Sequence, residues 1–134
     1  MDECIFCKII RGDIPSDTVY EDEHTIAFLD IAPVTKGHTL VVPKKHYPNL
    51  YETPDDVLAT IIKTTKYLST KIKKTLSADG INIINNNDPA AGQVVDHIHI
   101  HVIPRYKDDG LEHWKSEFTY QDGEKEAIKE NISL

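Results

Sequence analysis

The sequence predicts a single α+β domain built on a mainly antiparallel sheet, and two observations carry this prediction. Short β-branched segments bounded by turn residues recur along the chain, and one long amphipathic helix separates the first three from the last two. The chain has 134 residues, of which 40% are hydrophobic and 28% are charged, as is ordinary for one globular domain.

The N-terminal third is expected to hold a short helix and three strands. The apolar segment Ile5–Ile10 ends at Gly12 and Pro15, which predicts one or two helical turns. An Asp-Glu pair suits the turn of a hairpin, and Pro43 stops the last strand. The predicted strands are Thr18–Glu21, Thr25–Leu29 and His38–Val42.

A long helix is predicted to begin after Thr53 and to end before Gly80. Thr53 can cap the helix, Pro54 suits its first position, and the two aspartates that follow favour the positive end of its dipole. Apolar residues recur at three- and four-residue spacing, which gives one apolar stripe: Val57, Leu58, Ile61, Ile62, Leu68, Ile72 and Leu76.

Two further strands and a polar tail complete the prediction. The strands are expected over Ile81–Ile84 and Asp96–Ile103, with a polar loop over Asn85–Gly92 between them. The tail is polar from Lys107 onward, with one short helix near Glu124–Asn131.

Charge and hydropathy exclude several classes of protein. The formal net charge is −7, which argues against a general nucleic-acid partner because phosphate backbones need a basic footprint. The apolar runs are too short to span a membrane, so no membrane association is expected. The first residues lack the pattern of a secretory signal, and we therefore expect a cytoplasmic location.

The most informative stretch is His97-Ile98-His99-Ile100-His101. Side chains alternate across a strand, so the three histidines share one face while Ile98, Ile100 and Val102 face the core. Such a ridge of imidazoles suits two uses. One is metal binding by neutral imidazoles, and the other is a nucleophile flanked by groups that stabilise phosphate charge.

Cys4 and Cys7 are the only cysteines of the chain. In a reducing compartment, two cysteines at this spacing are typical of a metal pair or a redox pair. A redox pair should open a long helix inside a βαβ unit, and this pair lies near the start of the chain, which favours metal.

His-x-His-x-His followed by two apolar residues resembles the signature of the histidine triad (HIT) family of nucleotide-binding proteins. The resemblance covers residues 3–106 and includes the stretches 4–10, 28–33, 37–46, 80–82 and 91–93. It implies the HIT fold, with a five-stranded sheet, one long helix and a short N-terminal helix. It also implies a HIT domain over 1–110, a tail over 111–134 that packs on this domain or on a dimer partner, and a homodimer.

The resemblance further implies the catalytic roles. The middle histidine of the family is the nucleophile, which is His99 here, and a backbone carbonyl near His97 holds its other ring nitrogen. His101 and Gln93 should contact the phosphate, and His38 should support the nucleophile. The reaction would be attack on the α-phosphate of a purine ribonucleotide derivative, through a covalent nucleotidyl-histidine.

Nucleotide-binding positions follow in the same way. Asp30 matches the family's ribose carboxylate. The expected base contacts are Phe28, Ile31 and Ile9, for which a plain core position is an equal alternative. The expected phosphate contacts are Asn86, Gly92, Gln93, Val94, His99 and His101. Relatives often have Ser or Thr after the glutamine, and Val94 lacks that hydroxyl.

Some branches of the family hold a structural zinc ion, for which the matching ligands here are Cys4, Cys7, His46 and His97. The alternative is a pair of reduced buried cysteines beside a histidine that only packs. Four protein ligands leave no open position, so no catalytic metal is expected.

The leading functional hypothesis is a purine nucleoside phosphoramidase. A dinucleoside polyphosphate hydrolase is the alternative within the enzyme class, because it uses the same nucleophile. A nucleotide-binding adaptor with little turnover and a metal-storage protein are the alternatives from other classes.

Overall fold

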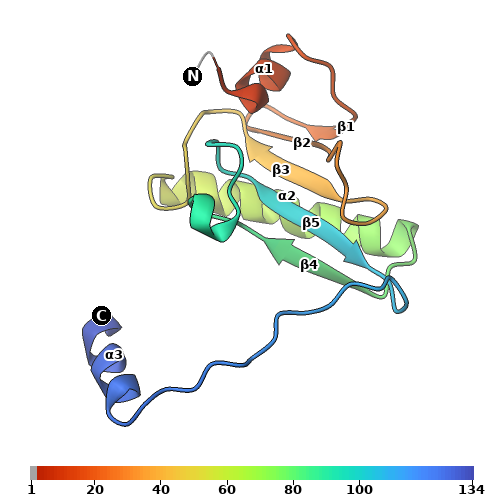
Figure 1. The fold of residues 1–134 in the computed structure, drawn as a ribbon. Helices are drawn as coiled ribbons and strands as arrows, with labels where there is room; N and C mark the ends of the chain where they lie inside the picture. Colours follow the sequence, from red (N-terminus) through yellow and green to blue (C-terminus); the bar gives the residue numbers. More distant parts are fainter. Residues whose placement is uncertain (1–2) are drawn as a thin grey trace.

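The computed structural model describes residues 3–134 and has an open five-stranded sheet with helices on both faces (Figure 1). The strand order is β1-β2-β3-β5-β4, and every neighbouring pair is antiparallel. This confirms the predicted α+β class. The elements are α1 (Ile5–Arg11), β1 (Thr18–Glu21), β2 (Thr25–Leu29), β3 (Thr39–Pro43), α2 (Asp55–Thr75), β4 (Gly80–Ile84), a 3-10 turn η1 (Pro89–Ala91), β5 (Ile100–Arg105) and α3 (Glu124–Ile132).

The last strand begins four residues later than predicted. The sequence alternates from Asp96, but β5 starts at Ile100, so His97 and His99 precede the strand. The backbone N–H of Ile98 donates to the carbonyl of Tyr47 at 2.7 Å, outside the sheet ladder. The first two histidines of the triad are therefore held by the segment that follows β3.

Helix α2 begins after a proline, and Thr53 does not cap it. Pro54 is the cap residue, and the Thr53 hydroxyl donates instead to the carbonyl of Asn49 at 2.6 Å. The expected apolar stripe is wrong at Ile62, which is half exposed. Thr65 is buried in the stripe instead, and its hydroxyl donates to the carbonyl of Ile61 at 2.7 Å, which satisfies its polar atom.

The sheet has a different apolar cluster on each face. On the α2 face, Ile61 and Leu68 pack against Ala27, Val41, Ile98, Ile100 and Val102. The predicted inward direction of Ile98, Ile100 and Val102 is thereby confirmed. On the opposite face, Phe6 of α1 packs against Ile26, Phe28, Leu40 and Val42.

The C-terminal tail leaves the domain after β5 (Figure 1). Residues 111–134 are exposed apart from Glu124, and the side chain of Trp114 is 99% exposed. The predicted helix is present as α3, which lies away from the sheet. Over the described residues, no helix is long and apolar enough to cross a membrane.

Candidate active site

A cavity of about 680 Å³ opens on the α1 face of the sheet. Helix α1 and the loop before β1 form one wall, and the ends of β2 and β5 form another. Nine of the ten residues predicted to contact a nucleotide line this cavity: Ile9, Phe28, Asp30, Ile31, Asn86, Gly92, Val94, His99 and His101. The structure therefore brings nine of these ten residues together around one cavity.

His99 is held in a single neutral tautomer. Its ring is 6% exposed, and its Nδ1 lies 2.8 Å from the carbonyl oxygen of His97. A carbonyl only accepts, so Nδ1 carries the proton and Nε2 keeps the lone pair. Burial lowers the pKa of His99, which favours the uncharged ring. The arrangement leaves an uncharged ring nitrogen with a free lone pair at the cavity.

An asparagine that the sequence analysis missed fixes the backbone of His99. Asn85 donates from Nδ2 to the carbonyl of His99 at 3.0 Å, and Asn87 donates to the side chain of Asn85 at 2.7 Å. Only Asn86 was assigned to the site from the sequence, and Asn86 lines the cavity. A run of three asparagines after a strand carries the signal, but it does not indicate which amide points where.

His38 is hydrogen-bonded to His101 rather than to His99. The backbone N–H of Val34 donates to Nδ1 of His38 at 3.0 Å, so the proton of His38 is on Nε2. This Nε2 donates to Nδ1 of His101 at 2.9 Å, which leaves the proton of His101 on its own Nε2. His101 therefore offers the cavity an N–H donor. Burial lowers its pKa to about 4, so the ring is neutral at pH 7.

Asp30 lies at the rim of the cavity, next to the His38–His101 pair. Its Oδ1 accepts the backbone N–H of Ala32 at 2.9 Å, and its Oδ2 is 3.6 Å from Nε2 of His38. These contacts orient the carboxylate while leaving lone pairs free for further donors.

Gln93 is not among the residues that line the cavity, and the expected contact between its amide and a phosphate stays a prediction. The side chain is 7% exposed. Its Oε1 accepts the backbone N–H of Asp88 at 2.8 Å, and its Nε2 donates to the carbonyls of Pro48 at 2.6 Å and Val95 at 3.0 Å. Both ends of the amide are thus bonded to backbone, and Gln93 shapes the loop that carries Gly92 and Val94.

Four side chains could hold a metal ion beside the cavity. The ligand atoms of Cys4, Cys7, His46 and His97 all lie within 4.8 Å of one another. The Cys4 Sγ to His97 Nδ1 distance is 3.5 Å, Cys7 Sγ to His46 Nδ1 is 3.3 Å, and the two Nδ1 atoms are 3.1 Å apart. A tetrahedral zinc ion with ordinary bond lengths needs edges of about 3.6 Å for S···N and about 3.3 Å for N···N.

His97 has the tautomer that such an ion requires. Its Nε2 lies 2.8 Å from the carbonyl of Pro43 and donates to it, so the lone pair is on Nδ1, which faces the sulfurs. Burial lowers the pKa of His97 to about 4, which keeps the ring neutral. The four groups therefore fit a closed, structural zinc site.

Phe6 joins the candidate metal site to the cavity, and the sequence analysis did not assign it. Its ring centroid lies 5.0 Å from that of His99, 5.9 Å from that of His97 and 5.5 Å from that of Phe28, each with an edge-on approach. Phe6 lies between Cys4 and Cys7 in sequence and lines the cavity. Any group that fixes the positions of Cys4 and Cys7 therefore also fixes the wall of the cavity that Phe6 forms.

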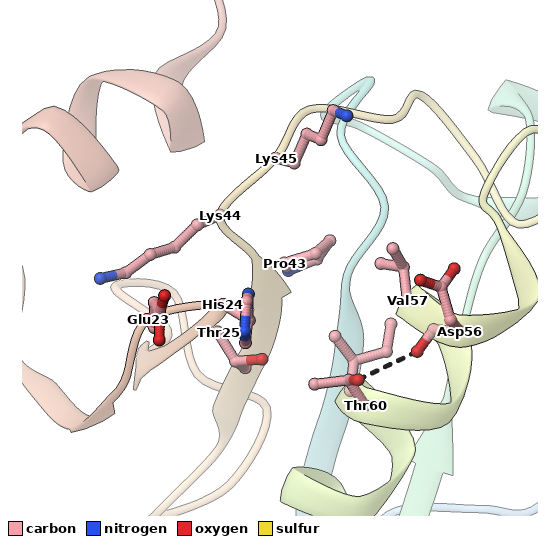
Figure 2. A pocket seen from close by; sticks show the side chains of 10 residues that line it. Glu23, His24, Thr25, Pro43, Lys44, Lys45, Asp56, Val57 and Thr60 are labelled. Atoms are coloured by element: carbon pink, nitrogen blue, oxygen red, sulfur yellow. Dashed lines mark hydrogen bonds between the residues drawn. The ribbon is translucent and has the colours of Figure 1, made fainter.

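A second cavity, of about 460 Å³, lies between the β2–β3 end of the sheet and the first turns of α2 (Figure 2). Its lining includes His24, Thr25, Lys44, Lys45 and Asp56, and it shares no residue with the triad cavity. Lys44 points away from α2, and its Nζ is 2.7 Å from a carboxylate oxygen of Glu21. This cavity therefore contributes nothing to the triad.

The model of the HIT domain family matches residues 11–108. The chain belongs to the HIT family. A HIT protein from Bacillus subtilis is 49% identical over 134 residues, which covers 98% of this chain and 90% of that protein. A crystal structure of a HIT family member from Bacillus subtilis superposes with a TM-score of 0.89 at 45% identity, covering 97% of this chain and 94% of that one.

Other HIT relatives have names that state an activity or a ligand. The adenosine 5'-monophosphoramidase of Schizosaccharomyces pombe is 40% identical and covers 97% of this chain and 96% of its own. An adenylylsulfatase of Arabidopsis thaliana is 46% identical over 86% of this chain, which spans 57% of that protein. A Zn-bound histidine triad protein of Mycobacterium smegmatis has a TM-score of 0.80 at 41% identity, covering 87% of this chain and 85% of its own.

Proposed function

We propose that this HIT protein hydrolyses purine ribonucleotide derivatives at the α-phosphate, through a covalent nucleotidyl group on His99. One observation carries the proposal: the buried His99 ring has its Nδ1 proton bonded to the His97 carbonyl, so its Nε2 lone pair is available at the cavity. An oriented neutral imidazole is the form of histidine that attacks phosphorus.

The chemical step follows from the two tautomers. The Nε2 lone pair of His99 forms a bond to the α-phosphorus while the bond to the leaving group breaks and its electron pair departs with that group. His101 donates its Nε2–H to a non-bridging phosphate oxygen, where negative charge increases in the transition state. Water then attacks the phosphorus, and the nucleoside monophosphate leaves His99 free.

The remaining lining residues suit the rest of a nucleotide. The Asp30 carboxylate can accept both hydroxyls of a ribose, because it keeps lone pairs free at the cavity rim. Phe28, Ile9 and Ile31 offer apolar surface for a base. Gly92, whose φ of 95° favours glycine, and the amide of Asn86 line the same cavity and can contact the phosphates.

The named activities of the relatives support this class of reaction. The monophosphoramidase and the adenylylsulfatase differ in the leaving group but share an adenylyl group. Hydrolysis of a dinucleoside polyphosphate would use the same nucleophile, and it is the second candidate for the same site.

We also propose that the protein binds one structural zinc ion through Cys4, Cys7, His46 and His97. The ligand spacing and the tautomer of His97 support this, as does the Zn-bound neighbour. When bound, the ion would tie α1 to the sheet and supply no reactive position. It would also restrain His97, whose carbonyl orients the nucleophile.

We further propose that two copies pair through the β4 edge of the sheet. An apolar groove of about 410 Å³ runs between α2 and β4, and it includes the exposed side chains of Leu50, Ile62 and Ile83. Exposed apolar grooves of this kind are typical of interfaces. The exposed tail, with Trp114 and Phe118, is then free to reach the partner. Light scattering of the native chain and of Ile83→Asp tests this pairing: the variant is expected to be a monomer.

Replacement of His99 tests the proposed nucleophile. We expect His99→Ala to lower kcat by at least about 10⁴-fold, since the covalent step loses its attacking atom. Nucleotide affinity, measured by titration calorimetry, should stay within about threefold because Asp30 and the apolar wall remain. The control is His24→Ala in the second cavity, which should retain full activity. Turnover of His99→Ala near the native rate would contradict the proposal.

A further inference from the structure

The two cysteines lie within one helical turn of each other. Cys4 is the cap residue of α1 and Cys7 is its third residue, so both side chains project from the same side of the helix. Both are free thiols, and their Sγ atoms lie within 4.8 Å of each other. A disulfide between them is therefore reached by rotation of the two side chains and needs no movement between distant segments.

The two sulfurs differ in their access to solvent. Cys4 is partly exposed, whereas Cys7 is only 9% exposed. A small oxidant in solution therefore meets Cys4 first, and Cys7 is close enough to react with the oxidised Cys4. An accessible sulfur with a second thiol beside it is the usual arrangement of a cysteine that is oxidised reversibly. The chain has no other cysteine that could compete for Cys4.

The same two sulfurs supply half of the ligand set of the proposed zinc site. Zinc binds cysteine as the thiolate, and a disulfide has no thiolate. After oxidation, only His46 and His97 of the four-residue cluster could still hold the ion. Two imidazoles do not complete a tetrahedral structural site, so a disulfide and a bound ion exclude each other. A metal pair and a redox pair are thus two states of one motif.

Oxidation would also remove the cap of α1. The backbone N–H of Cys7 donates to Sγ of Cys4 at 3.4 Å, and this is the side-chain hydrogen bond that caps the helix. A Cys4 side chain that turns to bond the sulfur of Cys7 gives up this contact. Because α1 has only 7 residues, its helical conformation depends on such anchors and on tertiary packing.

Helix α1 connects the cysteine pair to the triad cavity. Phe6 lies between the two cysteines, and its ring centroid is 5.0 Å from that of His99. Ile5 and Ile9 of the same helix also line the cavity. Loss of the cap and of the ion would therefore loosen the wall against which a nucleotide base would pack.

We propose that Cys4 and Cys7 form an oxidation site, at which a hydroperoxide converts the two thiols into a disulfide, releases the zinc ion and weakens nucleotide binding in the triad cavity. The proposal rests on the proposed zinc site and on the proposed nucleotide cavity. It adds a reversible control of both by the redox state of the surroundings.

The reaction has two steps. Sγ of Cys4 attacks one oxygen of hydrogen peroxide, so that an S–O bond forms, the O–O bond breaks, and the other oxygen leaves with the electron pair as hydroxide. Sγ of Cys7 then attacks the sulfur of Cys4, so that the S–S bond forms and the S–O bond breaks. The cysteines lose two electrons to the peroxide. In the zinc-loaded chain both sulfurs start as thiolates, so two protons from solvent complete the two water molecules, and Zn²⁺ is released.

The test exposes the full-length, zinc-loaded chain to hydrogen peroxide, with N-acetylcysteine treated in parallel as a reference thiol. The readouts are released zinc, remaining thiols, the intact mass of the chain and AMP affinity by titration calorimetry. None of them depends on turnover. The matched variant is Cys7→Asp, which keeps a possible oxygen ligand for zinc and removes the second sulfur.

We expect the oxidised native chain to lose both thiols, the mass of two hydrogen atoms and its zinc. Its AMP affinity should fall by roughly tenfold, and dithiothreitol with added zinc should restore it. Cys7→Asp should release zinc at least about tenfold more slowly and should gain oxygen on Cys4 instead of losing hydrogen. The mass of the native chain decides the disulfide by itself if the variant does not bind zinc.

Three results overturn the proposal. The first is a native chain that keeps both thiols while N-acetylcysteine is oxidised. The second is oxidation that yields a disulfide between two chains or an irreversible addition of oxygen. The third is an internal disulfide that leaves AMP affinity unchanged, which contradicts the link to the cavity.

Failure of the earlier proposals gives different results. A reduced chain that does not take up zinc overturns the zinc site, and the thiol, mass and AMP measurements then test the disulfide on the metal-free chain. A chain that shows the whole redox response but does not hydrolyse nucleotide derivatives overturns only the hydrolase function.

Discussion

The two faces of the sheet are covered by helices of very different length and are held in different ways. The 21 residues of α2 cover a continuous apolar cluster that includes Val41, Ile61 and Val102. The 7 residues of α1 cover a face that also carries the triad, where His97 and His99 are almost fully buried. The cluster on the first face is apolar, whereas the second face combines an apolar cluster around Phe6 with buried histidines that are hydrogen-bonded to specific partners.

The first prediction concerns the α2 face and has the largest expected effect on stability. Ile61→Ala should lower the free energy of unfolding by about 3 kcal/mol, because Ile61 is 1% exposed and the cavity left behind is not refilled. Urea denaturation measures the change. Well below the melting temperature, the kcat of the variant should equal that of the native chain, since no group of the triad cavity is altered. A comparable loss of kcat would show that the two faces are coupled.

Removal of a bound metal ion should affect the α1 face and, unlike Ile61→Ala, should lower nucleotide affinity as well as stability. In a chain loaded with zinc, chelation should lower the free energy of unfolding by about 2 kcal/mol or more. Because α1 also supplies Phe6 and Ile9 to the cavity, nucleotide affinity should fall by roughly tenfold. Calorimetric titration with AMP and metal analysis provide the readouts. Unchanged AMP affinity in the metal-free chain would show that the Cys–His cluster does not influence nucleotide binding in the cavity.

Acid should also weaken the α1 face selectively. The pKa of His101 is about 4 in the folded chain, against about 6.5 when unfolded. Between these values the unfolded chain binds more protons, so the free energy of unfolding falls as pH falls, by about 2 kcal/mol at pH 4.5 from this group. Urea denaturation at pH 6.5 and pH 4.5 measures how the free energy of unfolding changes with pH. His101→Asn should reduce it, and an unchanged slope would contradict the assignment.

The smallest expected effect belongs to Asn85. Asn85→Ala removes the amide that donates to the His99 carbonyl and should cost about 1 kcal/mol of stability. We expect kcat to fall by about tenfold with KM nearly unchanged, because the nucleophile loses one constraint while the substrate contacts persist. The matched control is Asn131→Ala in the exposed α3. Equal kinetics for the two variants would show that Asn85 does not contribute to catalysis.

The two faces also differed in how far the sequence could predict them. On the α2 face, helical and strand periodicity placed Ile98, Ile100 and Val102 correctly, because apolar burial repeats with the geometry of the backbone. On the α1 face, alternation also put three histidines on one side, but it set the start of β5 too early. The bond from Ile98 N–H to the Tyr47 carbonyl crosses 51 residues of sequence and has no local signal.

The individual partners within the site were the least predictable part. The Cys–His cluster and the roles of the triad were predicted only from the resemblance to the HIT family. The potential ligands of the cluster are up to 93 residues apart, so no local pattern connects them. The backbone partners of Gln93 were not predicted, because a buried amide can bond to backbone as well as to a ligand, and the choice depends on loop geometry. Phe6 and Asn85 were missed because an aromatic residue in a short helix and an asparagine in a polar run have many ordinary uses.

His97 contributes to the molecule twice, through chemically independent parts. Nδ1 of its imidazole faces the two sulfurs, whereas its main-chain oxygen accepts the hydrogen bond from Nδ1 of His99. Every amino acid supplies that oxygen. A variant of this chain with almost any other residue at position 97 would therefore lose the imidazole of the Cys–His cluster and still retain the acceptor that keeps His99 in this tautomer.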